Sequence, residues 1–159
     1  MRKIVAVLLT AVAFMASCST VDCPLNNVVY LKLSLNDGSG KFNDTLSIRT
    51  RRSDGTDTLL LNRLTNVGSA WLRVSYTQDR DIYFLTRTDT QLRSINDTLV
   101  VEKRDMPHFE SVECAPIYFH EITGLSCTHH SIDSVVLSNP RVDYDTTRTN
   151  ITLHFKVLD

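Results

Sequence analysis

Two segments near opposite ends of the chain alternate strictly between apolar and polar residues. From Val29 to Leu35 every second residue is valine or leucine, and residues 151–157 repeat this period of two. A β-strand points successive side chains to opposite faces, so both patterns predict half-buried strands. Further strands are predicted at residues 45–50, 58–61, 70–77, 81–86, 98–103, 109–113, 116–122 and 132–137.

The composition also predicts an all-β fold. After Cys18 the chain holds two alanines and seventeen threonines. Alanine favours helices, whereas β-branched side chains fit the pleated surface of a sheet. About ten short strands joined by polar turns predict an antiparallel two-sheet sandwich of the immunoglobulin-like type. A closed β-barrel is the alternative, because it gives the same sequence pattern.

The start of the chain has the pattern of an export signal. Two basic residues precede an apolar run from Ile4 to Phe14. A membrane-spanning helix needs about 20 apolar residues, and this run has roughly half that number. A short apolar run with a basic start is typical of a cleaved signal peptide.

Cys18 closes this segment. The sequence Met15-Ala16-Ser17-Cys18 resembles the lipobox of bacterial lipoproteins, in which lipid is attached to the cysteine sulfur and the preceding peptide is removed. We therefore expect a lipoprotein signal peptide at residues 1–17, whose helix is not part of the fold. After it we expect a lipidated tether at residues 18–22 and a single domain at residues 23–159.

The expected location is the outer membrane, through the lipid anchor on Cys18. Two or more acyl chains anchor a protein stably. No aspartate directly follows Cys18 to suggest the inner-membrane retention known in some bacteria. Without Arg2 and Lys3 the seventeen basic residues fall to fifteen, against eighteen acidic ones, so nucleic acid is not an expected partner. The periplasmic and surface sides both stay open.

Three further cysteines, Cys23, Cys114 and Cys127, lie in a chain whose expected compartment permits disulfides. A bond from Cys23 to Cys114 would close a loop of about 90 residues and contribute roughly 4 to 5 kcal/mol in the chain-entropy model. A bond from Cys114 to Cys127 would clip a hairpin. Either pairing leaves one thiol free.

Several short motifs are spread over the chain after Cys18: Asp22-Cys23, Asn96-Asp97-Thr98-Leu99, Ser111-Val112-Glu113-Cys114, Ile132-Asp133-Ser134-Val135 and Asn139-Pro140. With the lipid cysteine, they make the chain resemble a family of small, uncharacterised lipoproteins from Bacteroidetes. The resemblance implies a fold and a cellular address but no assigned activity. It favours the pairing of Cys23 with Cys114.

Five sites have an aspartate followed by serine or threonine and then by leucine, valine or threonine. They resemble the O-glycosylation sequence of exported Bacteroidetes proteins, which makes five hydroxyls candidates for modification: Thr45, Thr58, Thr98, Ser134 and Thr146. The structural alternative is that aspartate ends a turn and a β-branched residue opens the next strand.

Neither a metal site nor a catalytic site is expected. Cys127, His129 and His130, with His120, are possible zinc ligands, but their spacing matches no closed four-ligand pattern. The chain has no Gly-x-Ser-x-Gly elbow, His-Glu-x-x-His helix, phosphate-binding loop or dinucleotide fingerprint. We therefore expect no catalytic residues and no cofactor.

The expected function is that of a membrane-anchored envelope lipoprotein, a non-catalytic structural or interaction component that contacts an envelope protein. The alternative is a glycan-binding accessory lipoprotein. If Ala70, Leu72, Val74 and Tyr76 face inward, Trp71 faces outward beside Arg73, where an indole could stack on a sugar.

Overall fold

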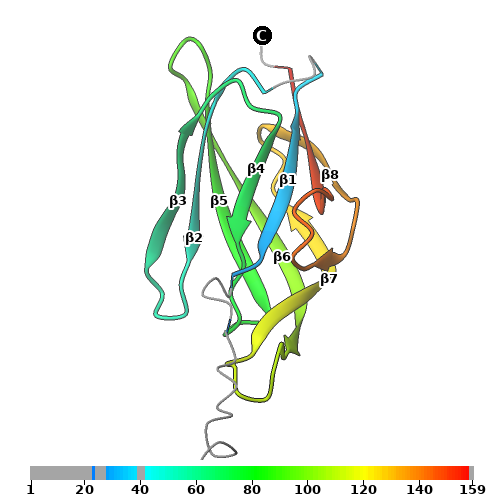
Figure 1. Ribbon diagram of the computed structural model, residues 1–159. Helices are drawn as coiled ribbons and strands as arrows, with labels where there is room; N and C mark the ends of the chain where they lie inside the picture. Colours follow the sequence, from blue (N-terminus) through cyan, green and yellow to red (C-terminus); the bar gives the residue numbers. More distant parts are fainter. Residues whose placement is uncertain (1–22, 24–27, 39–41, 158–159) are drawn as a thin grey trace, which may run out of the picture.

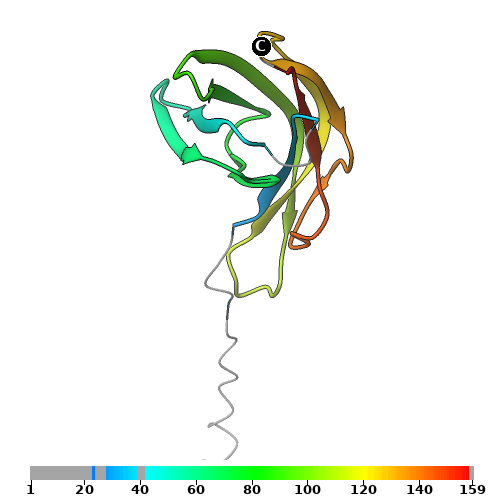
Figure 2. The same ribbon diagram turned by 90° about the horizontal axis from the view of Figure 1, so that it is seen from above.

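The computed structural model describes residue 23 and residues 28–38 and 42–157. In these residues the chain forms ten strands and no helix, arranged as two sheets that pack together (Figures 1 and 2). The strands are β1 (Tyr30–Asn36), β2 (Thr45–Arg51), β3 (Asp57–Leu64), β4 (Ser69–Arg73), β5 (Arg80–Thr88), β6 (Ser94–His108), β7 (Ile117–Cys127), β8 (Ile132–Leu137), β9 (Arg141–Val142) and β10 (Ile151–Phe155).

The two sheets form an open sandwich. The smaller sheet has the order β4-β1-β10-β8, and the larger sheet, which curls (Figure 2), has the order β3-β2-β5-β6-β7-β9. Within the described residues each sheet ends at strands with one neighbour, so the sandwich prediction is confirmed and the barrel alternative is not adopted.

One pair of strands departs from the antiparallel pattern. β1 and β10 run parallel, with Leu33 opposite Ile151, whereas the other strand pairs of the described chain are antiparallel. A parallel pair cannot be joined by a hairpin. Here all the intervening strands lie in the connection, because β1 is the first and β10 the last strand of the described residues.

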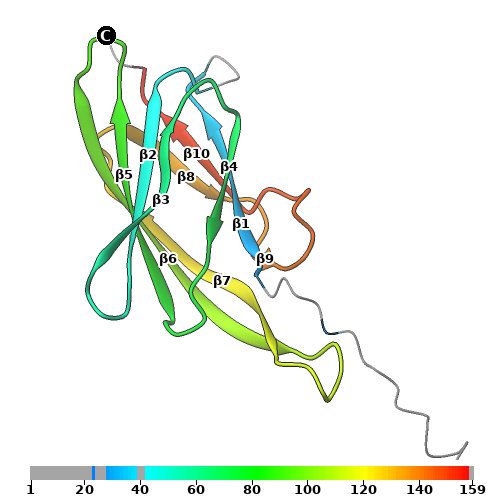
Figure 3. The same ribbon diagram turned by 60° about the vertical axis from the view of Figure 1, so that its left-hand side comes forward.

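Residues 109–113, predicted to be a strand, lie in the connection between β6 and β7. Phe109 is 59% exposed and Val112 is fully exposed. The reason is that β6 continues to His108 through Pro107, a residue that usually marks the end of a strand. Residues 104–108 and 117–121 of β6 and β7 pair beyond the rest of the sandwich, and we call this projection the arm (Figure 3).

The core lies between the sheets, and the inner face of the larger sheet is apolar only in its middle. The side chains there are at most 2% exposed: Tyr83, Leu85, Leu99 and Val101. Towards one end of this face, inward positions hold Asp81 and Lys103, and towards the other end they hold Arg87 and Asp97. All four are at most 5% exposed, so each needs polar partners inside the protein.

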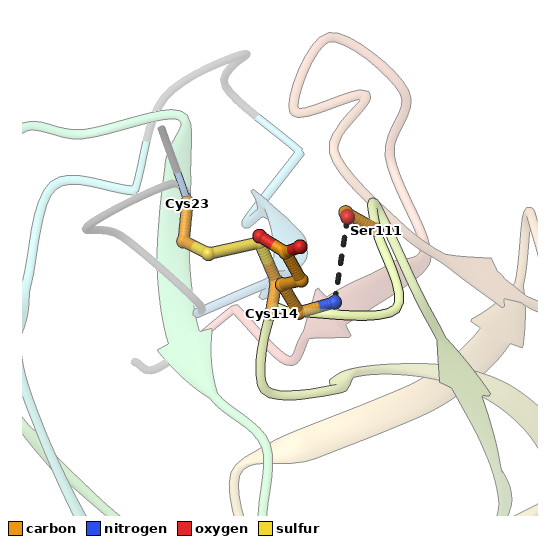
Figure 4. Close-up of a disulfide and its surroundings, with 4 residues drawn as sticks. Cys23, Ser111 and Cys114 are labelled. Carbon is orange, nitrogen blue, oxygen red and sulfur yellow. Dashed lines mark hydrogen bonds between the residues drawn. A yellow bond between two sulfur atoms is a disulfide. The ribbon is translucent and has the colours of Figure 1, made fainter. Parts of the chain in front are cut away.

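A disulfide joins the segment before β1 to the connection that follows β6 (Figure 4). Cys23 and Cys114 are bonded, with their Cα atoms 5.5 Å apart. The backbone N–H of Cys114 donates to the carbonyl oxygen of Ser111 at 3.2 Å, which closes the local turn. Cys127 is a half-buried free thiol. The pairing that the family resemblance implies is therefore confirmed.

Candidate functional site

A cleft of about 350 Å³ lies where the arm meets the start of β1 and the end of β4. Its lining combines aliphatic walls with four residues that carry polar groups: Val28, Val29, Val74 and Pro116, and Arg73, Tyr76, Tyr118 and His120. A concave, mostly apolar site of this size with a few polar groups is typical of small-molecule binding. We therefore take the cleft as the candidate functional site.

Two stacked tyrosines form part of the cleft wall. The ring centroids of Tyr76 and Tyr118 are 5.3 Å apart, and the ring planes differ by 11°. Tyr76 was expected to face the core, but β4 ends at Arg73, and the side chain is 64% exposed. The end of the strand frees Tyr76 to reach across to β7.

His120 contributes a buried ring to the cleft. The residue is only 2% exposed, and its Nδ1 lies 2.7 Å from Oδ1 of Asp105, the residue opposite it on β6. Burial lowers the pKa of His120 and outweighs the hydrogen bond and charge of Asp105, which act in the opposite direction. The ring is thus neutral near pH 7, and its Nδ1–H donates to Asp105.

Lys103 neutralises this carboxylate from inside the sheet. Its side chain is fully buried, and Nζ donates to Oδ1 of Asp105 at 2.7 Å and to the carbonyl oxygen of Gln78 at 2.5 Å. Asp105 therefore bridges a buried ammonium group and a histidine. Such a network fixes the orientation of the His120 ring.

Asp81 is a buried carboxylate near Lys103. Its oxygens accept from the backbone N–H of Ser75 at 3.3 Å. Burial raises the pKa of Asp81 from 3.8 to about 6, although the positive charge of Lys103 and the Ser75 N–H oppose this change. The neighbouring Tyr83 is fully buried, donates its hydroxyl to the carbonyl oxygen of Arg73 at 3.0 Å, and has a pKa well above its usual value because of burial.

Sequence analysis does not single out Asp81, Lys103 or Asp105. Their signal is weak: Asp81 stands two residues before Tyr83 and Lys103 two residues after Val101, so each shares a strand face with one apolar residue, whereas Asp105 stands two residues after Lys103. That signal indicates an inward-facing charge, but it does not show which other strand supplies the partner.

The zinc hypothesis involves residues that the fold separates. His120 and Cys127 lie towards opposite ends of β7, opposite Asp105 and Leu99 respectively. The Cys127 sulfur lies 3.8 Å from Nε2 of His129, and His130 donates its backbone N–H to Asp97. In the part of the chain that the structure describes, no three such side chains are placed to hold a metal ion.

The aspartates before Thr45, Thr58 and Thr98 have structural partners. Asp44, before Thr45, accepts from Nε of the buried Arg87 at 2.6 Å. Asp57, before Thr58, pairs with Arg51 at 3.0 Å. Asp97, before Thr98, lies inside β6 rather than at its start, so the turn-then-strand explanation does not apply to it.

Asp97 holds the connection between β7 and β8. Its carboxylate accepts five hydrogen bonds, from Thr128 Oγ1, the backbone N–H groups of His130, Ser131 and Ile132, and Ser131 Oγ. Burial alone would raise the pKa of Asp97, but these bonds outweigh it and hold the pKa below its usual value. Thr98 therefore follows a carboxylate that is occupied inside the protein.

The other two candidate hydroxyls are in different settings. Ser134 is a half-buried residue of β8 that follows the exposed Asp133. Thr146 is exposed in a turn between β9 and β10. Asp145 before it accepts from the backbone N–H of Thr147 at 3.0 Å and from Nε of Arg148 at 2.6 Å.

Trp71 lies on the outer face of the smaller sheet, as its alternation with Ala70 and Leu72 predicts. It is 44% exposed, and Lys32 on the paired β1 holds its ammonium group 5.7 Å from the ring centroid. Arg73 follows two residues later on the same strand, opposite Tyr30. This outer face thus combines an aromatic side chain with cationic ones, and it reaches the cleft at Arg73, the last residue of β4.

Comparison with known proteins places the chain in a family. The model of a family of unknown function, DUF6452, matches residues 45–155, which is more than half of the chain. The chain belongs to the DUF6452 family. No curated protein and no solved structure matches it.

The DUF6452 match includes Trp71 and the cleft residues that lie between positions 73 and 120. It also includes Asp81, Lys103 and Asp105. It begins after the disulfide residue Cys23 and after β1. Cys18 lies outside the residues that the structure describes. Among the described residues of this DUF6452 chain, no helix has the length and apolar character needed to cross a membrane.

Proposed function

We propose that this DUF6452 protein is a lipoprotein of Bacteroidetes, anchored in the outer membrane through Cys18, and that it serves as a non-catalytic interaction component of the envelope. The lipobox-like sequence that ends at Cys18 and the export-signal pattern before it support the anchor. The disulfide between Cys23 and Cys114 supports an oxidising compartment outside the cytoplasm.

The main support for this proposal is the position of the disulfide, which lies close in sequence to both Cys18 and the cleft. Cys23 stands five residues after Cys18, and its partner Cys114 stands two residues before Pro116 in the cleft wall. A lipid on Cys18 would therefore hold the domain by the end where the cleft opens. A partner or ligand of the envelope would meet the cleft there.

The chemistry of the cleft favours binding over catalysis. A histidine base needs a nucleophile or a second acid–base group positioned across a substrate. Asp105 orients His120, but no hydroxyl or thiol of the described chain bonds to the other ring nitrogen, and Lys103 already neutralises Asp105. This arrangement suits the positioning of a ligand.

Fractionation of native-host cells tests the anchor. The wild-type protein should sediment with outer membranes, whereas Cys18→Ser should be released into the soluble fraction. Cys127→Ser, which alters a free thiol away from the anchor, is the matched control and should sediment like the wild type. A Cys18→Ser protein that stays with the membranes would contradict the proposal. Cross-linking and mass spectrometry of mildly solubilised membranes should then recover an envelope partner.

A glycan-binding role is the second candidate, and the exposure of Trp71 beside two cationic side chains favours it. Exposed indoles stack on sugar rings and attract cations over their faces. Binding of envelope polysaccharide by the purified protein should be lost in Trp71→Ala and retained in Val136→Ala, a substitution at an exposed apolar residue of the same sheet. Equal binding by both variants would remove Trp71 from any such role.

A further inference from the structure

His120 presents a hydrogen-bonding nitrogen to the cleft without a protein partner. Its Nδ1 is bonded to Asp105, and no described residue bonds to its Nε2. In the described chain, every fully buried side-chain nitrogen or oxygen has a partner. Nε2 is therefore not sealed inside the protein. Since His120 lines the cleft and is 98% buried, the cleft gives access to this atom.

The network behind the ring decides what Nε2 can bind. Lys103 pairs with Asp105, and the Nδ1–H of His120 donates a hydrogen bond to the same carboxylate oxygen. A neutral imidazole that donates through Nδ1 accepts through Nε2. A group that fills the base of the cleft must therefore carry an O–H or N–H donor, because a buried acceptor left unsatisfied would oppose binding.

The walls and rim define the rest of the ligand. Val28, Val74 and the Tyr118 ring supply apolar surface suited to a flat, ring-containing body. Arg73 also lines the cleft, and it takes part in none of the ion pairs found among the described residues. A cationic residue that forms no ion pair among the described residues, at the rim of an apolar cleft, favours a carboxylate on the ligand.

We propose that this cleft binds a small, ring-containing organic acid, whose single O–H or N–H donor bonds to His120 and whose carboxylate pairs with Arg73. This assignment names the ligand class of the interaction site, so it rests on the proposed binding function but not on the lipid anchor. The ligand is bound and released unchanged.

Indole-3-acetate is a suitable probe, because it has one ring N–H, a flat apolar body and one carboxylate. It is titrated into the purified full chain with its disulfide intact, and the ¹⁵N signal of His120 Nε2 is followed by NMR together with calorimetry. Saturation should move that signal. Two matched probes remove one group each: 1-methylindole-3-acetate lacks the donor, and indole-3-acetamide lacks the charge. Each should bind about tenfold more weakly.

A protein variant tests whether Arg73 is the residue that binds the carboxylate of the probe. Arg73→Gln should bind indole-3-acetate and indole-3-acetamide equally well, while the Nε2 signal still moves on binding. Asn62→Asp, at an exposed position on β3 away from the cleft, is the control and should behave like the wild type. Equal affinity of the wild type for all three probes, no change of the His120 signal at millimolar probe, or an unchanged acid preference in Arg73→Gln would overturn the assignment. Any of these three results would reject the ligand assignment alone. The proposed envelope function would still be tested by fractionation and cross-linking.

Discussion

Replacing Asp81 with asparagine should stabilise the protein at neutral pH and have little effect in acid. The folded chain raises the pKa of this carboxyl from 3.8 to about 6, mainly by burial, so the folded state disfavours its ionised form. At about 1.4 kcal/mol per pKa unit, the difference corresponds to about 3 kcal/mol. The native state binds the proton more tightly than the unfolded state, so this stability is complete below pH 3.8 and is lost as the pH rises through about 6.

The assay is urea unfolding of wild type and Asp81→Asn at pH 4 and pH 7.5, with the disulfide intact. The asparagine keeps a carbonyl oxygen for the Ser75 N–H, so its packing is closely matched. The variant should gain about 2.5 kcal/mol relative to wild type between the two pH values, because part of the effect already appears at pH 4, just above the unfolded pKa. Asp133→Asn, at an exposed position, should show no such gain. A stability difference between Asp81→Asn and wild type that does not change with pH would refute the reasoning.

Three other changes test the remaining features. Asp44→Asn leaves the buried Arg87 without its counter-charge and should cost about 3 to 5 kcal/mol in chemical unfolding. Cys114→Ser opens the long disulfide loop and should cost roughly 4 to 5 kcal/mol in the same assay. If the native host glycosylates the chain, peptide mapping by mass spectrometry should find sugar on the exposed Thr146 and none on Thr98.

Control variants, or outcomes that would contradict the expectation, can be stated for each of these changes. Arg51→Gln breaks an exposed ion pair and should cost no more than about 1 kcal/mol. Cys127→Ser removes a free thiol and should leave the disulfide loop intact. An Asp44 variant as stable as the Arg51 variant would contradict the role assigned to burial. Sugar on Thr98 would contradict the view that Asp97 is fully engaged inside the fold.

Alternation along the sequence was sufficient to predict much of the sandwich. It identified β1 and β10, and it placed Trp71 on an outer face, because side-chain direction along a strand is a local property. It could not show that β1 and β10 are neighbours or that they run parallel, since the period of two does not depend on the partner strand. Residues 109–113 mimic a strand locally, but pairing of β6 with β7 decides where the turn falls.

The cleft was harder to predict for the same reason. Val28, Arg73 and His120 come from three distant parts of the chain, and each has an ordinary local sequence. The charges at Asp81 and Lys103 stand out only once their strands are known to face inward. Sequence reasoning thus missed both the buried charges and the tertiary packing that makes them a site.

The pairing of β1 with β10 has a consequence for biogenesis. Leu33 and Ile151 are neighbours although 118 positions separate them, so the centre of the smaller sheet stays incomplete until the C-terminal strand is synthesised. Contacts between such distant segments slow folding. If the chain is threaded through a secretion channel with its N-terminus leading, it remains unfolded, and accessible to chaperones and thiol oxidases, until its last strand has passed.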